Sequence, residues 1–209
     1  YKKWYGIDHK SKKHVKNSIY AITEFTRAKL YKYNIIACPG CYPTSIQLPL
    51  IPLIKNKMVN VDNIVIDSKS GYSGAGKNLR KKFPIQNLFQ SVVAYGVGSH
   101  RHMPEIDQEI SNASARKIKV FFTPHLIPMY RGILSTLYLD LNKRITPKKI
   151  WNFLRIYHKK NFFVKIEKFN KSIGTGEVIN TNFCKISVFK GRKKNKVIIV
   201  SVIDNLIKG

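Results

Sequence analysis

A cysteine at the start of an expected helix constrains this chain more than any other feature. Residues 37–46 read Ala-Cys-Pro-Gly-Cys-Tyr-Pro-Thr-Ser-Ile, and a short apolar run, Asn34–Ala37, leads into them. Proline is favoured at the start of helices, and apolar residues recur at helical spacing across Thr44–Lys57. The pattern predicts a strand, a tight turn and a helix, with Cys41 presented at the turn.

This position makes Cys41 a candidate nucleophile. The unpaired N–H groups and partial positive charge of a helix N-terminus can lower a thiol pKa from about 8.5 into the range ~3.5–7.5. We therefore expect a thiolate at neutral pH that can form a covalent intermediate. The alternative is a small buried cysteine with no chemical role.

Cys38 and Cys41 also form a C-x-x-C pattern, which leaves a thioredoxin-like dithiol or half of a zinc site as further alternatives. No second C-x-x-C and no H-x3-5-H follows at zinc-ribbon spacing, so we expect no metal. Three cysteines in a chain of 209 residues do not make a disulfide framework and favour a reducing, cytoplasmic setting.

Two loops carry groups suited to a site. In Gly98–Ile106, His100 and His102 flank Arg101, which concentrates proton-exchanging and anion-binding side chains in one loop. The glycine-rich run Ser68–Lys77 lets backbone approach a ligand closely, yet it matches neither G-x-G-x-x-G nor the P-loop. A solvated surface loop is the alternative reading of both.

Helices and strands are both plentiful, and the order favours an α+β fold with a mixed, largely antiparallel sheet flanked by helices. Gly191–Asn195 makes the last two strands a hairpin. Besides the strand at 34–37 and the helix at 44–57, the expected helices are 18–30, 104–110 and 147–159, and the expected strands are 61–67, 92–97, 118–122, 133–141, 162–166, 183–189 and 197–203.

The net charge of +27 indicates either compositional bias or nucleic-acid binding. The basic residues are spread along the chain rather than gathered in one stripe, and the densest groups, including 80–82, fall in expected loops. This distribution favours bias over a nucleic-acid partner. No apolar run approaches the ~18 residues of a membrane span, so we expect no membrane partner.

Taken together and in order, several segments resemble N-acetyl-gamma-glutamyl-phosphate reductase, a family of the aspartate-semialdehyde dehydrogenase superfamily. The resemblance covers nearly the whole chain and is carried by residues 39–44, 70–77, 100–106, 122–134, 181–184 and 204–209.

The resemblance implies an NADP-dependent reduction of N-acetyl-L-glutamyl 5-phosphate to N-acetyl-L-glutamate 5-semialdehyde and phosphate, a step of arginine biosynthesis. Cys41 would attack the acyl phosphate and form a thioester, which then accepts hydride. His102 or His100 would move the proton, and the sequence does not choose between them. The resemblance further implies substrate contacts from Arg101, Arg131 and Glu105, and cofactor contacts from Ser70, Gly71, Ser73, Gly74 and Asn205.

It also implies a domain division. Residues 1–40 would be the tail of an NADP-binding Rossmann domain, and residues 41–203 a catalytic, substrate and oligomerisation domain like the C-terminal domain of glyceraldehyde-3-phosphate dehydrogenase. Residues 204–209 would begin the return to the cofactor domain. The chain has no glycine-rich dinucleotide fingerprint, so we expect that it does not bind NADP well or turn over by itself.

We expect a homo-oligomer, either a dimer or a tetramer, because this is usual in the family. The alternatives are a sister reductase acting on N-acetyl-aminoadipyl or aspartyl phosphate, and an inactive basic fragment that binds nucleic acid. One methylene is worth only ~1–3 kcal/mol of discrimination, so the aminoadipyl substrate is the harder one to separate.

Overall fold

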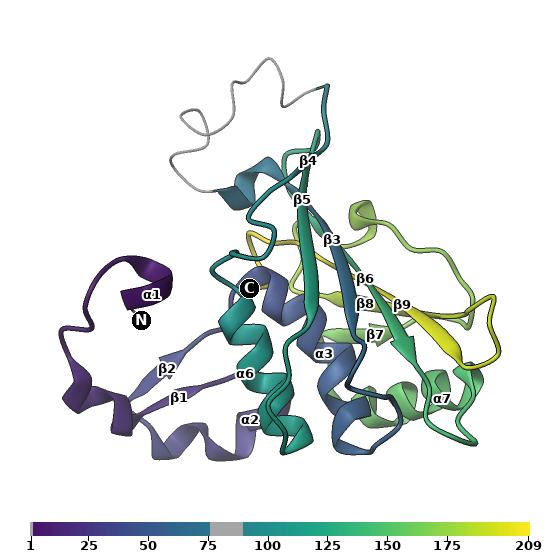
Figure 1. The fold of residues 1–209 in the computed structure, drawn as a ribbon, viewed down its shortest axis with the longest axis horizontal. Coiled ribbons are helices and arrows are strands. Elements are labelled where there is room, and N and C mark those ends of the chain that lie inside the picture. Colours follow the sequence, from purple (N-terminus) through teal and green to yellow (C-terminus); the bar gives the residue numbers. More distant parts are fainter. Residues whose placement is uncertain (1, 76–89) are drawn as a thin grey trace.

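The computed structural model describes residues 2–75 and 90–209 and contains two sheets (Figure 1). The loop residues 76–77 and the basic group 80–82 singled out in the sequence lie outside the described residues. Strands β1 (Ser18–Tyr20) and β2 (Ile35–Ala37) form a parallel two-stranded sheet. With the short helices α1 (Lys2–Tyr5) and α2 (Thr23–Thr26), this sheet lies to one side of the main body.

The main body is a seven-stranded sheet in the order β4-β5-β3-β6-β9-β8-β7. The pairs β3–β5 and β7–β8 are parallel and the other pairs are antiparallel, which confirms the expected mixed, largely antiparallel sheet. The strand bounds are β3 Val65–Gly71, β4 Val93–Ala94, β5 Phe121–Ile127, β6 Ile133–Asp140, β7 Val164–Ile166, β8 Cys184–Lys190 and β9 Lys196–Ile203.

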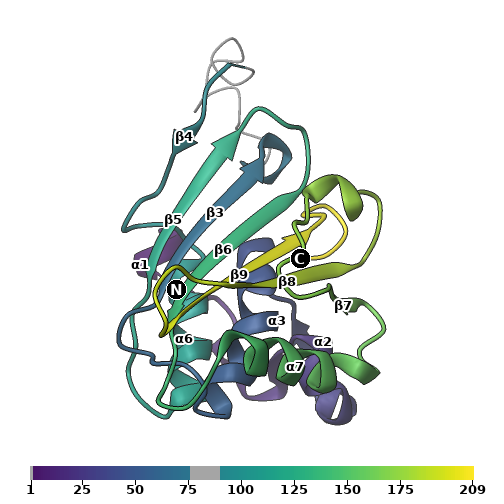
Figure 2. The ribbon, with the colours of Figure 1, turned by 90° about the vertical axis from the view of Figure 1, so that its right-hand side faces the viewer.

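Three helices flank this sheet. Figure 2 shows β5, β3, β6, β9 and β8 side by side, with α3 (Cys41–Lys55), α6 (Met103–Ser114) and α7 (Pro147–Tyr157) gathered along one side. Helix α6 lies in the chain between β3 and β5, which are parallel, as expected of strands joined through a crossover helix. Among the described residues, no helix is both long and apolar enough to cross a membrane.

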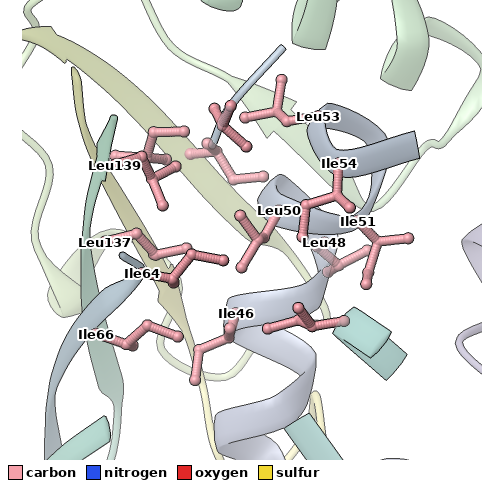
Figure 3. Packing of buried hydrophobic residues seen from close by; sticks show 14 of the residues in the cluster. Ile46, Leu48, Leu50, Ile51, Leu53, Ile54, Ile64, Ile66, Leu137 and Leu139 are labelled. Carbon is pink, nitrogen blue, oxygen red and sulfur yellow. The ribbon is translucent and has the colours of Figure 1, made fainter. Parts of the chain in front are cut away.

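Helix α3 is buried on all sides and forms the centre of the core. Ile46, Leu50 and Leu53 have no exposed surface, and Ile46 and Leu50 lie opposite Ile66 and Leu137 of the sheet (Figure 3). Full burial of such a side chain contributes about 1.5–3 kcal/mol relative to exposure. Because α3 is fixed so firmly, its first residue, Cys41, has a defined place at the edge of the core.

Two prolines inside α3 leave carbonyl groups without their usual donors. Pro52 has no N–H to offer the carbonyl of Leu48, and the Nε2 of His158 lies 3.1 Å from that oxygen instead. His158 is buried, with its Nδ1 3.0 Å from the side-chain nitrogen of Asn161. His158 therefore contacts the α3 carbonyl that Pro52 leaves without its usual N–H donor.

The clearest error in the sequence prediction is the helix over residues 18–30. The structure has β1 there, then α2, then a 3-10 helix over Arg27–Lys32. Ser18, Ile19 and Tyr20 pair with β2, so a strand partner that lies 17 residues away overrides the local apolar spacing.

Several boundaries also move. Helix α3 begins at Cys41 rather than Thr44, and α6 starts one residue earlier and ends four residues later than expected. Helix α7 ends at Tyr157 before a 3-10 turn, β4 has only two residues, and β7 starts at Val164. Strand β3 lies four residues later than expected, and β5 starts three residues later and ends five residues later. Their ends were hidden because buried Ser68 and Ser70 break the apolar alternation of β3, and Pro124 lies inside β5.

Candidate active site

A cavity of about 430 Å³ lies at the N-terminus of α3. Its lining includes Cys41, His100 and His102, the three candidate catalytic residues from the sequence, and Arg101, a candidate anion-binding residue. Segments from four parts of the chain meet there, and the remaining lining residues are Trp4, Tyr42, Ser70, Gly74, Tyr95, Gly96 and Ser99.

Cys41 is the first residue of α3, directly after the N-cap residue Gly40. Hydrogen bonds from the backbone N–H groups of Cys41 and Tyr42, together with the charge of Arg101, favour the thiolate. Burial acts in the opposite direction and is the larger effect, so the pKa of the Cys41 thiol is raised above its ordinary value. The expectation of a lowered pKa is therefore wrong for this structure, because the turn that aligns the helix N-terminus also removes the sulfur from water.

His102 packs directly against the residue that precedes the cysteine. A Cβ atom placed on Gly40 would lie 2.5 Å from the His102 Nε2, so only glycine leaves room for the ring. Burial is the main cause that lowers the pKa of His102 to about 3, with smaller contributions from His100 and Arg101. The imidazole is therefore neutral near pH 7, and its buried Nδ1 has no hydrogen-bond partner among the described residues.

His100 plays a different part in the same loop. Its Nδ1 accepts a hydrogen bond of 3.1 Å from the backbone N–H of His102, the N-cap residue of α6. Its ring stands edge-on to Tyr42 and Tyr95, with ring centres 5.5 and 5.3 Å away. The structure thus gives His100 a fixed orientation, and leaves the buried Nδ1 of His102 without a hydrogen-bond partner among the described residues.

Glu105 lies behind the cysteine turn rather than among the cavity-lining residues. Its Oε1 accepts a 2.9 Å hydrogen bond from the Gly40 N–H and a 2.8 Å hydrogen bond from the Tyr20 hydroxyl. Burial raises the pKa of Glu105, although both hydrogen bonds oppose that shift. The carboxyl group predicted to contact substrate therefore supports the backbone that carries Cys41.

Arg131 likewise faces the protein rather than the cavity. Its Nε lies 2.9 Å from the carboxylate of Asp204, and its Nη1 donates a 2.8 Å hydrogen bond to the Asn180 side chain. Asp204 is fully buried and also accepts from the Asn180 backbone N–H at 2.7 Å. Arg131 is not among the residues that line the cysteine cavity, and among the described residues Arg101 is the arginine that lines it.

The residues predicted to bind cofactor split in the same way. Ser70 and Gly74 line the cavity. Asn205 accepts a 2.6 Å hydrogen bond from the Gly132 N–H and donates one of 3.1 Å to the Ser73 hydroxyl, so its amide ties two loops together. Gly71 fits closely against a neighbouring backbone, because a Cβ there would lie 2.6 Å from the Tyr130 carbonyl oxygen.

The two thiols of the C-x-x-C pattern line different cavities. Cys38 is exposed and lines a separate cavity of about 340 Å³, whereas Cys41 lines the cavity at the N-terminus of α3. The described residues contain no group of three or more histidine, cysteine or acidic side chains that could hold a metal ion.

Sequence reasoning missed the tyrosines of the site. The Tyr95 hydroxyl donates a 3.1 Å hydrogen bond to that of Tyr42, and both rings line the cavity. The position of Tyr42 beside the nucleophile was a usable signal. Tyr20 and Trp4 gave none, because their proximity to the site depends on how the N-terminal segment folds back.

This chain is similar in sequence to known proteins of one family. A model of the semialdehyde dehydrogenase dimerisation domain matches residues 41–205. The N-acetyl-gamma-glutamyl-phosphate reductase of Ehrlichia canis (strain Jake) is 40% identical over the whole chain, which covers 60% of that protein. A probable chloroplastic N-acetyl-gamma-glutamyl-phosphate reductase of Oryza sativa subsp. japonica is also 40% identical over the whole chain, which covers 50% of that protein.

Solved structures share the fold at much lower identity. The aspartate semialdehyde dehydrogenase II of Vibrio cholerae superposes with a TM-score of 0.70 at 15% identity, over 94% of this chain and 65% of that one. The chain spans 50 to 60% of the length of the two curated relatives named above.

Proposed function

Since the chain belongs to the semialdehyde dehydrogenase family, whose dimerisation domain it contains, we propose that its cavity reduces an acyl phosphate to an aldehyde through a cysteine thioester. The carrying observation is that Cys41, His102 and Arg101 line one cavity at a helix N-terminus. The similarity to N-acetyl-gamma-glutamyl-phosphate reductases over the whole chain supports N-acetyl-L-glutamyl 5-phosphate as the substrate, and hence a role in arginine biosynthesis.

The first chemical step falls to Cys41. Its sulfur attacks the acyl carbon, the carbon–oxygen bond to phosphate breaks, and a thioester forms as phosphate leaves. Because burial raises the thiol pKa, the proton must be removed as the bond forms. Arg101 lies in the same cavity and supplies a fixed positive charge for the phosphate or carboxylate of the substrate.

We assign the proton transfers to His102. It is neutral, so it can accept the thiol proton and later return a proton to the oxygen that becomes the aldehyde. Its available Nδ1 and its contact with Gly40 favour it over His100, whose Nδ1 is already bonded to the His102 backbone.

The cofactor we propose is NADP, whose reduced form, NADPH, would supply the hydride when bound. Gly74 has no side chain and lines the cavity beside Ser70, so this segment fits the approach of a nicotinamide toward Cys41. Asn205 and Ser73 hold that segment in place from behind. Residues 1–40 contribute β1 and β2, which we take to be the tail of the cofactor domain, with residues 41–203 as the catalytic domain and 204–209 as the return segment.

We propose that the protein forms a homodimer, or a tetramer built from dimers, through the face of the large sheet opposite the helices. Phe121, Val65 and Tyr138 lie in one cross-strand row there and are 67%, 37% and 44% exposed. The dimerisation-domain match agrees with this assignment. The three cysteines are all free, which supports a reducing, cytoplasmic location.

The deciding experiment uses the full-length protein and follows NADP reduction by N-acetyl-L-glutamate 5-semialdehyde with and without phosphate. Activity that requires phosphate and disappears in Cys41→Ser is the expected result. Activity with the aminoadipyl or aspartyl semialdehyde instead would assign a sister substrate. A folded protein that binds NADP but shows no phosphate-dependent reaction with any of the three would contradict the proposed function.

A further inference from the structure

A hydrogen-bonded chain joins the N-terminal two-stranded sheet to the cysteine turn. The Gln47 side-chain nitrogen donates to the Tyr20 hydroxyl at 3.0 Å, and that hydroxyl donates to the Glu105 Oε1 at 2.8 Å. The same Oε1 accepts the N–H of Gly40 at 2.9 Å. The chain therefore begins on α3, crosses β1 and α6, and returns to the residue immediately before Cys41.

The direction of each hydrogen bond in this series follows from the chemistry of its groups. The amide nitrogen of Gln47 can only donate, so the Tyr20 oxygen accepts from it and uses its single proton for Glu105. Gln47 is 1% exposed and belongs to the rigid core helix. The orientation of the Tyr20 hydroxyl is thus fixed at one end by the core and at the other by a carboxylate.

The consequence for the site is positional. Gly40 is the N-cap residue of α3, and its N–H is held by Glu105 in the first turn of α6. His102 is the N-cap residue of that same helix α6. One carboxylate therefore sets the spacing between the turn that carries the nucleophile and the turn that carries the proposed base.

We propose that Tyr20 is a positioning residue for the nucleophile: its hydroxyl holds Glu105 on the Gly40 amide and so fixes the Cys41 turn relative to α6. Tyr20 lies outside the matched dimerisation domain, on the strand assigned above to the cofactor domain. The placement of that two-stranded sheet is in this way coupled to the reactivity of a thiol it does not touch. The inference rests on the proposed function only where the test below measures kcat and KM.

The test is Tyr20→Phe in the full-length protein, which removes one oxygen and keeps the ring. Tyr31→Phe is the matched control, because Tyr31 lies in the same N-terminal segment and is 81% exposed. Two quantities are measured: the rate of Cys41 alkylation by iodoacetamide as a function of pH, and kcat and KM for the proposed reaction. A hydrogen bond to a charged group is worth enough to change either rate about tenfold.

We expect Tyr20→Phe to lower kcat about tenfold with little change in KM, and to alter the pH profile of alkylation, while Tyr31→Phe does neither. Combined with Glu105→Gln, Tyr20→Phe should add less than its separate effect, because both act through one carboxyl oxygen. An unchanged alkylation profile in folded Tyr20→Phe, or fully additive effects, would overturn the assignment.

If Tyr20→Phe does not fold, Gln47→Leu provides the same readout by releasing the other end of the hydroxyl, and an unchanged alkylation profile there overturns the assignment equally. Failure of the proposed function is distinguishable, since alkylation needs neither substrate nor cofactor. A changed alkylation profile in a protein without the proposed activity would leave Tyr20 in its role and remove the reaction.

Discussion

The contact between Gly40 and His102 makes Gly40→Ala a sharp probe of the site. The backbone of Gly40 has φ −68° and ψ 167°, which alanine adopts without strain, so the substitution acts only through its added methyl group. That carbon would lie 2.5 Å from Nε2 and 2.7 Å from Cε1 of His102, whereas ordinary contacts begin at 3.4 Å. The ring must therefore retreat by about 0.9 Å, because the other side of the contact is the backbone of the turn.

A misplacement of roughly 1 Å in a catalytic group can reduce the rate about 100-fold, whereas overpacking of this kind costs about 1–3 kcal/mol of stability. We expect Gly40→Ala to lose about 100-fold in kcat while remaining folded at 25 °C, with Cys41 still open to alkylation. The control is Gly174→Ala, since Gly174 has φ −132° and no atom within 4 Å of the added carbon. Turnover within about twofold of the unmodified protein would refute the assignment of His102 as the proton-transfer group.

Three further results are expected. Because burial raises the Cys41 pKa above its ordinary value, its alkylation rate should still be rising at about pH 9, and a plateau below about pH 8 would contradict this. Burial lowers the pKa of His158 in the folded protein to about 4, from an ordinary value of 6.5. Between these two values only the unfolded chain gains a proton, so stability present above pH 6.5 should be lost as pH falls toward 4. The expected loss in the free energy of unfolding is about 3 kcal/mol for the unmodified protein. Urea unfolding at both pH values should show a smaller loss for His158→Gln. Arg131→Met leaves Asp204 buried without its cation. It should lower the free energy of unfolding by an amount near the lower end of ~3–5 kcal/mol, because the Arg131 side chain is 22% exposed. A denaturant midpoint within error of the unmodified protein would contradict this prediction.

The N-terminal segment shows where local patterns stop being informative. Residues 18–30 carry helical apolar spacing, yet Ser18–Tyr20 is a strand because β2 offers it a partner. The same fold-back brings Tyr20 to Glu105, 85 residues away in the sequence. No local signal could have predicted either contact, since both depend on a partner distant in the chain.

Sequence patterns were enough to identify Cys41 as the proposed nucleophile, the strand–turn–helix that carries it, the two histidines beside Arg101, and the class of sheet. These follow from short-range rules: helix-start chemistry around Cys41, apolar periodicity, and residue types concentrated in one loop. Other features are visible only in the tertiary structure. Arg131 and Glu105 bond to protein groups away from the cavity lining, and His102 contacts Gly40. Burial has a larger effect on the Cys41 pKa than the helix N-terminus has. Solvent exclusion and long-range hydrogen bonds depend on everything that packs around a group, and that information is spread over the whole chain.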